Sequence, residues 1–364
     1  MFKNRCHVLL VAMLAIPENR GAIKTGIQQT TNNEQQTTNN EQQTTNNKQQ
    51  TTNNKQQTTN NKQQTTNNKQ RTTNSITFVK TNTKGMIVFP HAKINLGLYV
   101  TDRRADGYHN IQSLLLPVAL HDVLELIPSP DGATHFTRTG LSVDGDADND
   151  LVMQAWRLLQ QHHTLPHVYI HLHKVIPTGA GLGGGSSDAA FLLRLTNDQF
   201  QLGLSVGAMQ QYAATLGMDS PFFIRSRPAL ATERGDQLTA IDFNLVGKTI
   251  VIVKPDCHIS TRQAYAAITP AQPFMPITEA IRQPISQWMQ AIHNDFEPVA
   301  INQCPEISHL KTRLLNAGAT YAAMTGSGSA IFALFTEPPV HLTAKEFPEA
   351  FFWKAKMTEM KMEW

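Results

Sequence analysis

Apolar side chains are distributed unevenly along this chain of 364 residues. Residues 28–74 contain none, so that segment has nothing with which to build a core. From residue 168 apolar side chains alternate with polar ones, which predicts a half-buried strand ending near Val175. Five glycines within 179–185 then break the pattern, and helical spacing resumes after Asp188. The local order is therefore strand, glycine loop and helix N-terminus.

Similar patterns recur on both sides of this segment. Apolar residues at helical spacing, with capping and stop residues, predict helices at 150–159, 205–216 and 305–318. Short apolar and β-branched runs predict strands at 250–253, 320–324 and 330–335. Strands and helices thus mix through both halves of the chain, which indicates an α+β fold.

The polar segment is a seven-residue unit, QQTTNNE or QQTTNNK, which is repeated six times from Gln28. A coiled coil would need two apolar positions in each unit, and this unit has none. We therefore expect residues 1–85 to be a disordered low-complexity tail, or a wrongly placed start, and the folded protein to begin at Met86. The remaining length suits two domains that share a cleft, at 86–240 and 241–364.

Charge and cysteine content narrow the class of protein. Residues 86–364 carry 20 Lys and Arg against 25 Asp and Glu, which argues against a nucleic-acid-binding surface. No apolar run reaches the roughly 18 residues of a membrane-spanning helix. The three cysteines lack the spacing of a zinc site or of a disulfide framework, so neither is predicted. We expect a cytoplasmic protein, monomeric or weakly dimeric.

The glycine loop is the strongest chemical signal. Glycines let backbone N–H groups approach a ligand, and the following helix offers free N–H donors, so the loop predicts a polyphosphate site. A flexible linker is the alternative, but linkers rarely stand between a strand and a helix. No Lys follows the glycines as in a Walker A loop, and no dinucleotide fingerprint is present. The residues predicted to hold the phosphates are Pro177, Thr178, Gly179, Ala180, Gly181, Leu182, Gly183, Gly184, Gly185, Ser186 and Ser187.

The spacing of this loop resembles the phosphate loop of the GHMP small-molecule kinases. Residues 91–98 (HAKINLGL) resemble the first motif of that family, and residues 325–330, with Gly326, Ser327 and Gly328, resemble its third. The resemblance implies phosphoryl transfer from ATP, with Mg²⁺ expected to arrive with the nucleotide. It also implies the two-domain GHMP kinase fold, with an S5-like N-terminal domain and a ferredoxin-like C-terminal domain.

Within the family, residues 104–109 (RADGYH) resemble the branch that acts on a cytidylyl-erythritol compound. That resemblance implies that Tyr108 stacks on cytosine, that His109 hydrogen-bonds to it, and that Asn95 also binds substrate. It further implies that Asp219 is the catalytic base and that Lys93 orients it. From the residues alone, the less favoured alternatives are that Asp219 is a turn cap and that Tyr108 packs a loop onto the core.

Other readings stay open at this point. Homoserine kinase or a kinase of the mevalonate pathway would share the glycine loop, but should lack the RADGYH segment. A non-catalytic nucleotide or sugar sensor would keep the loop and lose Lys93 or Asp219, and both are present. We predict no protein-bound metal site: the pair His171 and His173 has no third ligand in view. Asp102, Asp106 and Asp122 are expected to be solvated or capping residues.

Overall fold

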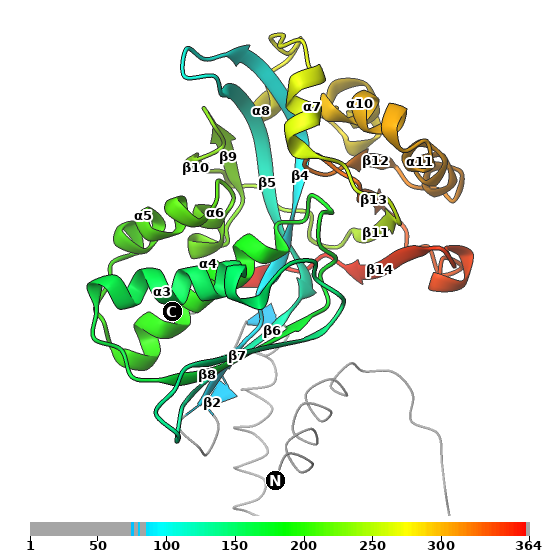
Figure 1. The fold of residues 1–364 in the computed structure, drawn as a ribbon. Helices are drawn as coiled ribbons and strands as arrows, with labels where there is room; N and C mark the ends of the chain where they lie inside the picture. Colours follow the sequence, from blue (N-terminus) through cyan, green and yellow to red (C-terminus); the bar gives the residue numbers. More distant parts are fainter. Residues whose placement is uncertain (1–73, 76–78, 81–84, 362–364) are drawn as a thin grey trace, which may run out of the picture. The chain divides into compact units, whose positions relative to one another are not determined.

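The computed structural model describes residues 74, 75, 79, 80 and 85–361 (Figure 1). Most of the predicted tail, with the whole of its repeat up to residue 73, lies outside the described residues. At the end of this segment, Val79–Lys80 (β2) pairs antiparallel with Met86–Val88 (β3). The described strands thus begin before Met86, where apolar and β-branched residues resume in the sequence (76–79).

The remaining strands form two four-stranded sheets, the rest of a five-stranded sheet and a two-stranded pair. Their orders are β10-β9-β5-β4, β12-β13-β11-β14, β2-β3-β6-β8-β7 and β1-β15. The strands are β1 (Asn74–Ser75), β4 (His91–Arg103), β5 (His109–His121), β6 (Val123–Pro128), β7 (His135–Gly140), β8 (Val168–Lys174), β9 (Ala229–Thr232), β10 (Gln237–Ala240), β11 (Thr249–Pro255), β12 (Tyr321–Met324), β13 (Ile331–Phe335), β14 (Ala350–Lys356) and β15 (Met360–Lys361).

Helices stand between these strands in the sequence, as the pattern predicts. The α-helices are α3 (Leu151–His162), α4 (Gly184–Phe200), α5 (Val206–Leu216), α6 (Ser220–Arg225), α7 (Thr261–Ala267), α8 (Ile277–Ala280), α9 (Trp288–Ala291), α10 (Phe296–Gln303) and α11 (Glu306–Asn316). Short 3₁₀ helices are η1 (Ala147–Asn149), η2 (Ile285–Gln287) and η3 (Ala344–Glu346).

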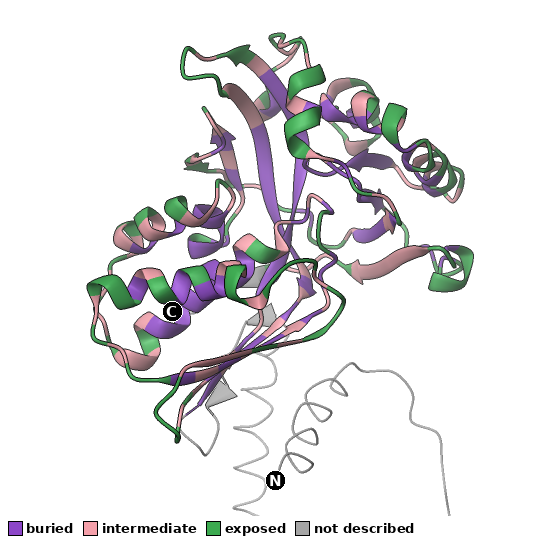
Figure 2. Cartoon of the chain, viewed as in Figure 1, coloured by how far each residue is buried: buried purple, intermediate pink, exposed green. Residues whose placement is uncertain are grey.

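One core lies between the five-stranded sheet and the helices α3 to α6. Trp156 and Phe191 of the helices share this core with Leu126 and Ile170 of the strands. Helix α4 is buried along ten consecutive residues, 187–196, which Figure 2 shows in the colour of buried residues. Its buried side chains include polar ones such as Asp188 and Arg194 as well as apolar ones, so neighbouring elements enclose this part of the helix. Its burial fixes the glycine loop at its N-terminus.

Strand β11 is buried on both of its faces, which explains the continuous apolar run in its sequence. Ile250 and Ile252 share a core with Ile94 and Leu96 of β4. The alternate residues of β11 lie instead in the core formed with α10 and α11. Strand β4 therefore contributes to both of these cores, and a bridge joins its Leu98 to Asn294, just before α10 (Figure 1).

The predicted elements are confirmed, with one shift of boundary. Asp150 caps α3 and accepts the N–H of Val152, while Ser205 and Gly217 cap the two ends of α5. Helix α4, in contrast, begins at Gly184, before the predicted start. Its N-cap Gly183 has a φ of 71°, so the last glycines of the loop form the first helical turn.

Candidate active site

A cleft of about 640 Å³ collects most of the predicted site residues. It is lined by Pro177 to Ser186 of the glycine loop and by Gly326, Ser327 and Gly328 of the later loop. Lys93, Asn95 and Asp219 line it as well. Four segments that are far apart in the sequence thus meet around one cavity of a size that suits a small ligand.

The glycine loop presents backbone donors to this cleft. Gly181 and Gly183 have φ values of 73° and 71°, a conformation in which other residues are strained. The first hydrogen bond of α4 runs from the N–H of Ser187 to the carbonyl oxygen of Gly183. The N–H groups of the first helical turn are therefore left without a partner inside the helix. Such free N–H groups at the positive end of a helix dipole are suited to an anion.

The two glycine loops touch through their backbones. A Cβ atom at Gly181 would lie 2.0 Å from the carbonyl oxygen of Thr325. The Thr325 hydroxyl donates to the Gly181 carbonyl oxygen at 3.2 Å, and it accepts the N–H of Asn95 at 2.9 Å. Asn294 donates its side-chain amide to the carbonyl oxygens of Met324 and Gly326. The later loop is thus held from both sides in the position where it lines the cleft.

Replacement of Gly181 by Ala should damage the nucleotide site. The Cβ would collide with backbone, and the resulting shift and strain cost about 1–3 kcal/mol. We expect the KM for ATP to rise about 10-fold or more. Gly203→Ala is the matched control, because Gly203 also has a positive φ, of 69°, yet nothing lies within 4 Å of its Cβ position. Equal ATP constants for both variants would contradict the contact between the loops.

Lys93 and Asp219 form an ion pair inside the cleft. Lys93 Nζ lies 3.1 Å from Asp219 Oδ2 and donates to Asn95 Oδ1 at 2.5 Å. The Lys93 side chain is 3% exposed, whereas that of Asp219 is 39% exposed. The backbone N–H of Lys93 also donates to the carbonyl oxygen of Leu182. The carboxylate therefore faces the cavity, held by a lysine that is anchored to the glycine loop.

Aromatic residues gather at another part of the cleft. The His109 ring stacks on Tyr265, with centroids 5.3 Å apart, and Tyr265 lines the cleft. Burial and the charge of Asp219 raise the pKa of Tyr265 to about 12. Tyr108, which is 52% exposed, lies beside Arg234, another cleft residue. Tyr108 and His109 thus stand one contact away from the cavity lining, at the hairpin between β4 and β5.

A buried charge cluster supports the glycine loop, and the sequence gives no sign of it. Lys174 Nζ donates to Asp122 at 2.5 Å and to Asp188 at 2.6 Å. Asp122 also accepts the N–H groups of Val175 and Ile176. Asp122 is fully buried, so of the two expected roles, solvated or capping, the structure shows the second: its carboxylate accepts backbone N–H groups just after β8.

The same cluster perturbs the ionisation of its members. Burial raises the pKa of Asp188 well above its ordinary value. Burial opposes the charge on Lys174, yet the neighbouring carboxylates hold the pKa of Lys174 above its usual range. One lysine is thus shared by two buried carboxyl groups next to the phosphate loop. We assign this cluster a positioning role.

Several residues that line the cleft were not predicted from the sequence. Arg234 and His258 line the cavity, and a Cβ at Gly179 would lie 2.7 Å from the His258 ring. Neither residue belongs to a local pattern, so only the fold could reveal them. Ser187 behaves differently from the prediction, because it is fully buried and its Oγ has no hydrogen-bond partner among the described residues. Ser186 is the serine of this pair that lines the cleft.

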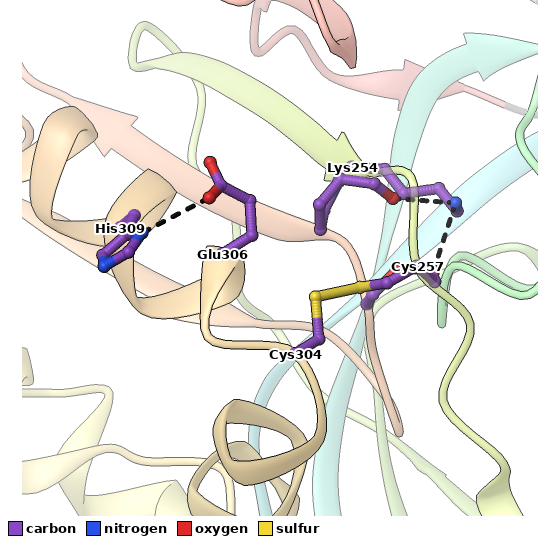
Figure 3. Close-up of a disulfide and its surroundings, with 7 residues drawn as sticks. Lys254, Cys257, Cys304, Glu306 and His309 are labelled. Carbon is purple, nitrogen blue, oxygen red and sulfur yellow. Dashed lines mark hydrogen bonds and ion pairs between the residues drawn. A yellow bond between two sulfur atoms is a disulfide. The ribbon is translucent and has the colours of Figure 1, made fainter.

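A disulfide joins the loop after β11 to the end of α10, although the sequence analysis predicted none (Figure 3). Cys257 and Cys304 are 47 residues apart in the sequence, and the fold brings their Cα atoms to 6.6 Å. No spacing motif could have paired them. Cys257 directly precedes His258, and its carbonyl oxygen accepts the Ser329 hydroxyl. The disulfide therefore links the segment next to His258, which lines the cleft, to the C-terminal end of α10.

The described part of the chain also contains a second cavity and a histidine pair outside this cleft. A larger cavity of about 880 Å³ is lined by residues such as Arg227, Phe243 and Met357, and by no predicted site residue. His171 and His173 both hydrogen-bond to the Thr139 hydroxyl. Among the described residues no three His, Cys, Asp or Glu side chains are arranged to hold a metal ion. None of the described helices combines the length and apolarity needed to cross a membrane.

Comparisons with known proteins agree with this geometry. The family model "GHMP kinases N terminal domain" matches residues 150–227, and "GHMP kinases C terminal" matches 277–351. The 4-diphosphocytidyl-2-C-methyl-D-erythritol kinase of Bacteroides fragilis is 44% identical over 274 residues, which are 75% of this chain and 100% of that protein. The enzyme of the same name from Bacteroides thetaiotaomicron is 47% identical over 252 residues, 69% of this chain and 92% of the relative.

A solved structure extends the similarity to three dimensions. A crystal structure of 4-(cytidine 5'-diphospho)-2C-methyl-D-erythritol kinase aligns with a TM-score of 0.64 at 28% identity, and covers 75% of this chain and 100% of that one. The predicted two-domain GHMP kinase fold is thereby confirmed. The sequence similarity, the matching fold and the cleft lead to one conclusion: the chain belongs to the 4-diphosphocytidyl-2-C-methyl-D-erythritol kinase family of the GHMP kinases.

Proposed function

We propose that this protein transfers the γ-phosphoryl group of ATP to the 2-hydroxyl of 4-diphosphocytidyl-2-C-methyl-D-erythritol, which gives the 2-phosphate and ADP. The product would serve the non-mevalonate route to isoprenoid precursors. The observation that carries the proposal is the Lys93–Asp219 pair, which lines the same cleft as both glycine loops. We further propose that residues 86–240 form the ATP-binding domain and 241–364 the second domain.

Asp219 is the proposed catalytic base. Its half-exposed carboxylate accepts the proton of the substrate hydroxyl as the oxygen attacks the γ-phosphorus. The bond from that phosphorus to the bridging oxygen of ADP breaks in the same transfer. Lys93 holds the carboxylate in place through its contact of 3.1 Å. Asn95 holds Lys93 from the other side, at 2.5 Å.

The charge that develops on the transferred group needs donors that are already in position. The free N–H groups at the start of α4, together with Gly181 and Gly183 in the loop, supply them without reorganisation. We propose that Pro177 to Ser186 surround the triphosphate of ATP and that Gly326, Ser327 and Gly328 close the opposite wall. Ser187 supports this loop from inside the core.

Mg²⁺ is expected to arrive with the nucleotide. Mg²⁺ is usually held by one or two carboxylates together with substrate phosphates, and it neutralises charge on the phosphates. The cleft offers the hydroxyls of Ser186 and Ser327 as further oxygen ligands, because both residues line it. These hydroxyls, together with the phosphates of ATP, are the groups that would hold the ion, while the Asp219 carboxylate stays free to accept the proton.

The cytidine part of the substrate is assigned to the aromatic residues. Tyr108 offers an exposed ring face, and His109 stacks on Tyr265 beside the cleft. Base–aromatic stacking contributes about 1–3 kcal/mol per base. We propose that Tyr108 stacks on the cytosine and that His109 hydrogen-bonds to it. The glycine loop accounts for the use of ATP, whereas these rings select the acceptor.

A substrate panel tests the proposal. ATP consumption by the purified protein should be fast with the cytidylyl-erythritol compound and near background with mevalonate or homoserine. Turnover of either of the latter at a comparable kcat/KM would favour the alternative that this is another GHMP kinase. ATP binding without turnover of any of the three would favour a nucleotide or sugar sensor.

A further inference from the structure

The cleft contains one cation whose role the mechanism above does not explain. Among the described residues that line it, Lys93 and Lys174 are buried. Lys93 forms an ion pair with one carboxylate and Lys174 with two. Arg234 also lines the cleft, but its side chain is 37% exposed. An accessible guanidinium in a cavity that admits phosphates is a candidate for anion recognition.

The position of Arg234 is well defined by its surroundings. It lies in the turn between β9 and β10, and the carbonyl oxygen of the preceding residue, Glu233, accepts the N–H of Ile111 at 2.7 Å. Asp236 accepts one Nη2 hydrogen bond from Arg234 at 2.7 Å. A guanidinium has five N–H donors, so this contact orients the group and leaves others free.

The neighbour of Arg234 on the other side is Tyr108. The guanidinium carbon lies 5.5 Å from the centroid of the Tyr108 ring. The backbone of Tyr108 is held at the hairpin tip, because its N–H donates to Asp106 at 3.1 Å. A base that stacks on the ring face opposite the guanidinium lies one ring away from Arg234, so the groups attached to the base and its sugar come within reach of Arg234.

The proposed substrate has a second anionic group besides the phosphates of ATP, namely its own diphosphate between cytidine and methylerythritol. Resting on the function proposed above, we propose that Arg234 is a specificity-determining residue that binds this diphosphate of the acceptor. The planar guanidinium matches phosphate oxygens in a bidentate manner. The glycine loop and α4 then serve the nucleotide, while the turn between β9 and β10 serves the acceptor.

The experiment compares Arg234→Ala with Tyr108→Ala, using cytidine and cytidine diphosphate as competitive inhibitors against the cytidylyl-erythritol substrate. Loss of a charge-assisted contact should raise the KM for that substrate and the Ki for cytidine diphosphate about 10- to 100-fold in Arg234→Ala. The Ki for cytidine, the KM for ATP and kcat should change less than about threefold. Tyr108→Ala should weaken cytidine and cytidine diphosphate alike, by about 5- to 150-fold.

Further variants guard against indirect effects. Arg234→Lys keeps the charge but not the planar fork, so its loss should be intermediate. Arg227→Ala removes an exposed arginine that lines the other cavity, and its constants should equal those of the unmutated protein. Direct calorimetric binding of cytidine diphosphate to each variant gives the same ranking without turnover.

Two results would overturn the inference while leaving the proposed function intact. In the first, the unmutated protein phosphorylates the cytidylyl-erythritol compound, yet Arg234→Ala retains its KM and its affinity for cytidine diphosphate. In the second, Arg234→Ala weakens cytidine as much as cytidine diphosphate, which would place Arg234 on the nucleoside. An unmutated protein that neither uses the substrate nor binds cytidine diphosphate would instead refute the proposed function itself, and the inference with it.

Discussion

Asp219→Asn should lower kcat by about 10²-fold or more, because general-base catalysis contributes about 10²- to 10⁴-fold and an amide cannot accept the proton. The change also leaves the buried Lys93 without its partner, so the melting temperature should fall, but by less than in Lys174→Met, because the Asp219 side chain is 39% exposed. The KM for ATP should change little, since the glycine loop keeps its geometry. Steady-state kinetics with saturating ATP and a thermal melt give both quantities.

Lys93→Met extends this test to the partner of the base. Methionine fills much of the space of the buried lysine stem but leaves Asp219 without its cation, so we expect kcat to fall about 10²-fold here as well. Asp242→Asn is a suitable control, because Asp242 is exposed and lines the other cavity. An Asp219→Asn variant with the kcat of this control would remove Asp219 from the mechanism.

Lys174→Met should be among the most destabilising single substitutions in the protein. It leaves the carboxylates of Asp122 and Asp188 buried without their cation, and breaking a buried ion pair costs about 3–5 kcal/mol. Denaturant unfolding should show this loss in the free energy of unfolding at pH 8. Arg157→Met, which breaks the exposed pair with Asp148, should cost less than about 1 kcal/mol.

The pH dependence of Lys174→Met gives a second signature. Burial raises the pKa of Asp188 even with the lysine present, and removal of the cation should raise it further. The folded variant then binds more protons than its unfolded chain, so its stability should fall as the pH rises from 5 to 8. Adding Asp188→Asn should recover part of the loss. A variant that is equally stable at both pH values and matches Arg157→Met would contradict the buried cluster.

The sequence predicted those features of the fold that depend on residues close together in the chain. The strand before the glycine loop, the caps of α3 and α5 and the glycine loop itself each depend on neighbouring residues, and the structure confirms these elements. The pairing of Lys93 with Asp219 came only from resemblance to a family, since nothing in either segment requires the other. In the fold, a hydrogen bond from the N–H of Lys93 to the carbonyl oxygen of Leu182 holds Lys93 beside the glycine loop, where it contacts Asp219.

The remaining parts of the site depend on contacts that have no local pattern. In the sequence, Asp122 resembles an ordinary turn carboxylate. It is buried only in the fold, where the end of β8 and the first turns of α4 pack around it. Arg234 enters the cleft only because β9 pairs with β5, which brings its turn beside the hairpin of Tyr108. The disulfide between Cys257 and Cys304 likewise arises from packing of α10 near the end of β11.

The most direct test of the account is to identify the product. The protein would be incubated with ATP, Mg²⁺ and the cytidylyl-erythritol compound, and the mixture followed by ³¹P and ¹³C nuclear magnetic resonance. We predict a new phosphomonoester signal that appears in step with ADP, with phosphorus coupling at carbon 2 of the erythritol unit. ATP that stays intact, or a phosphate attached to any other hydroxyl, would contradict the proposed function.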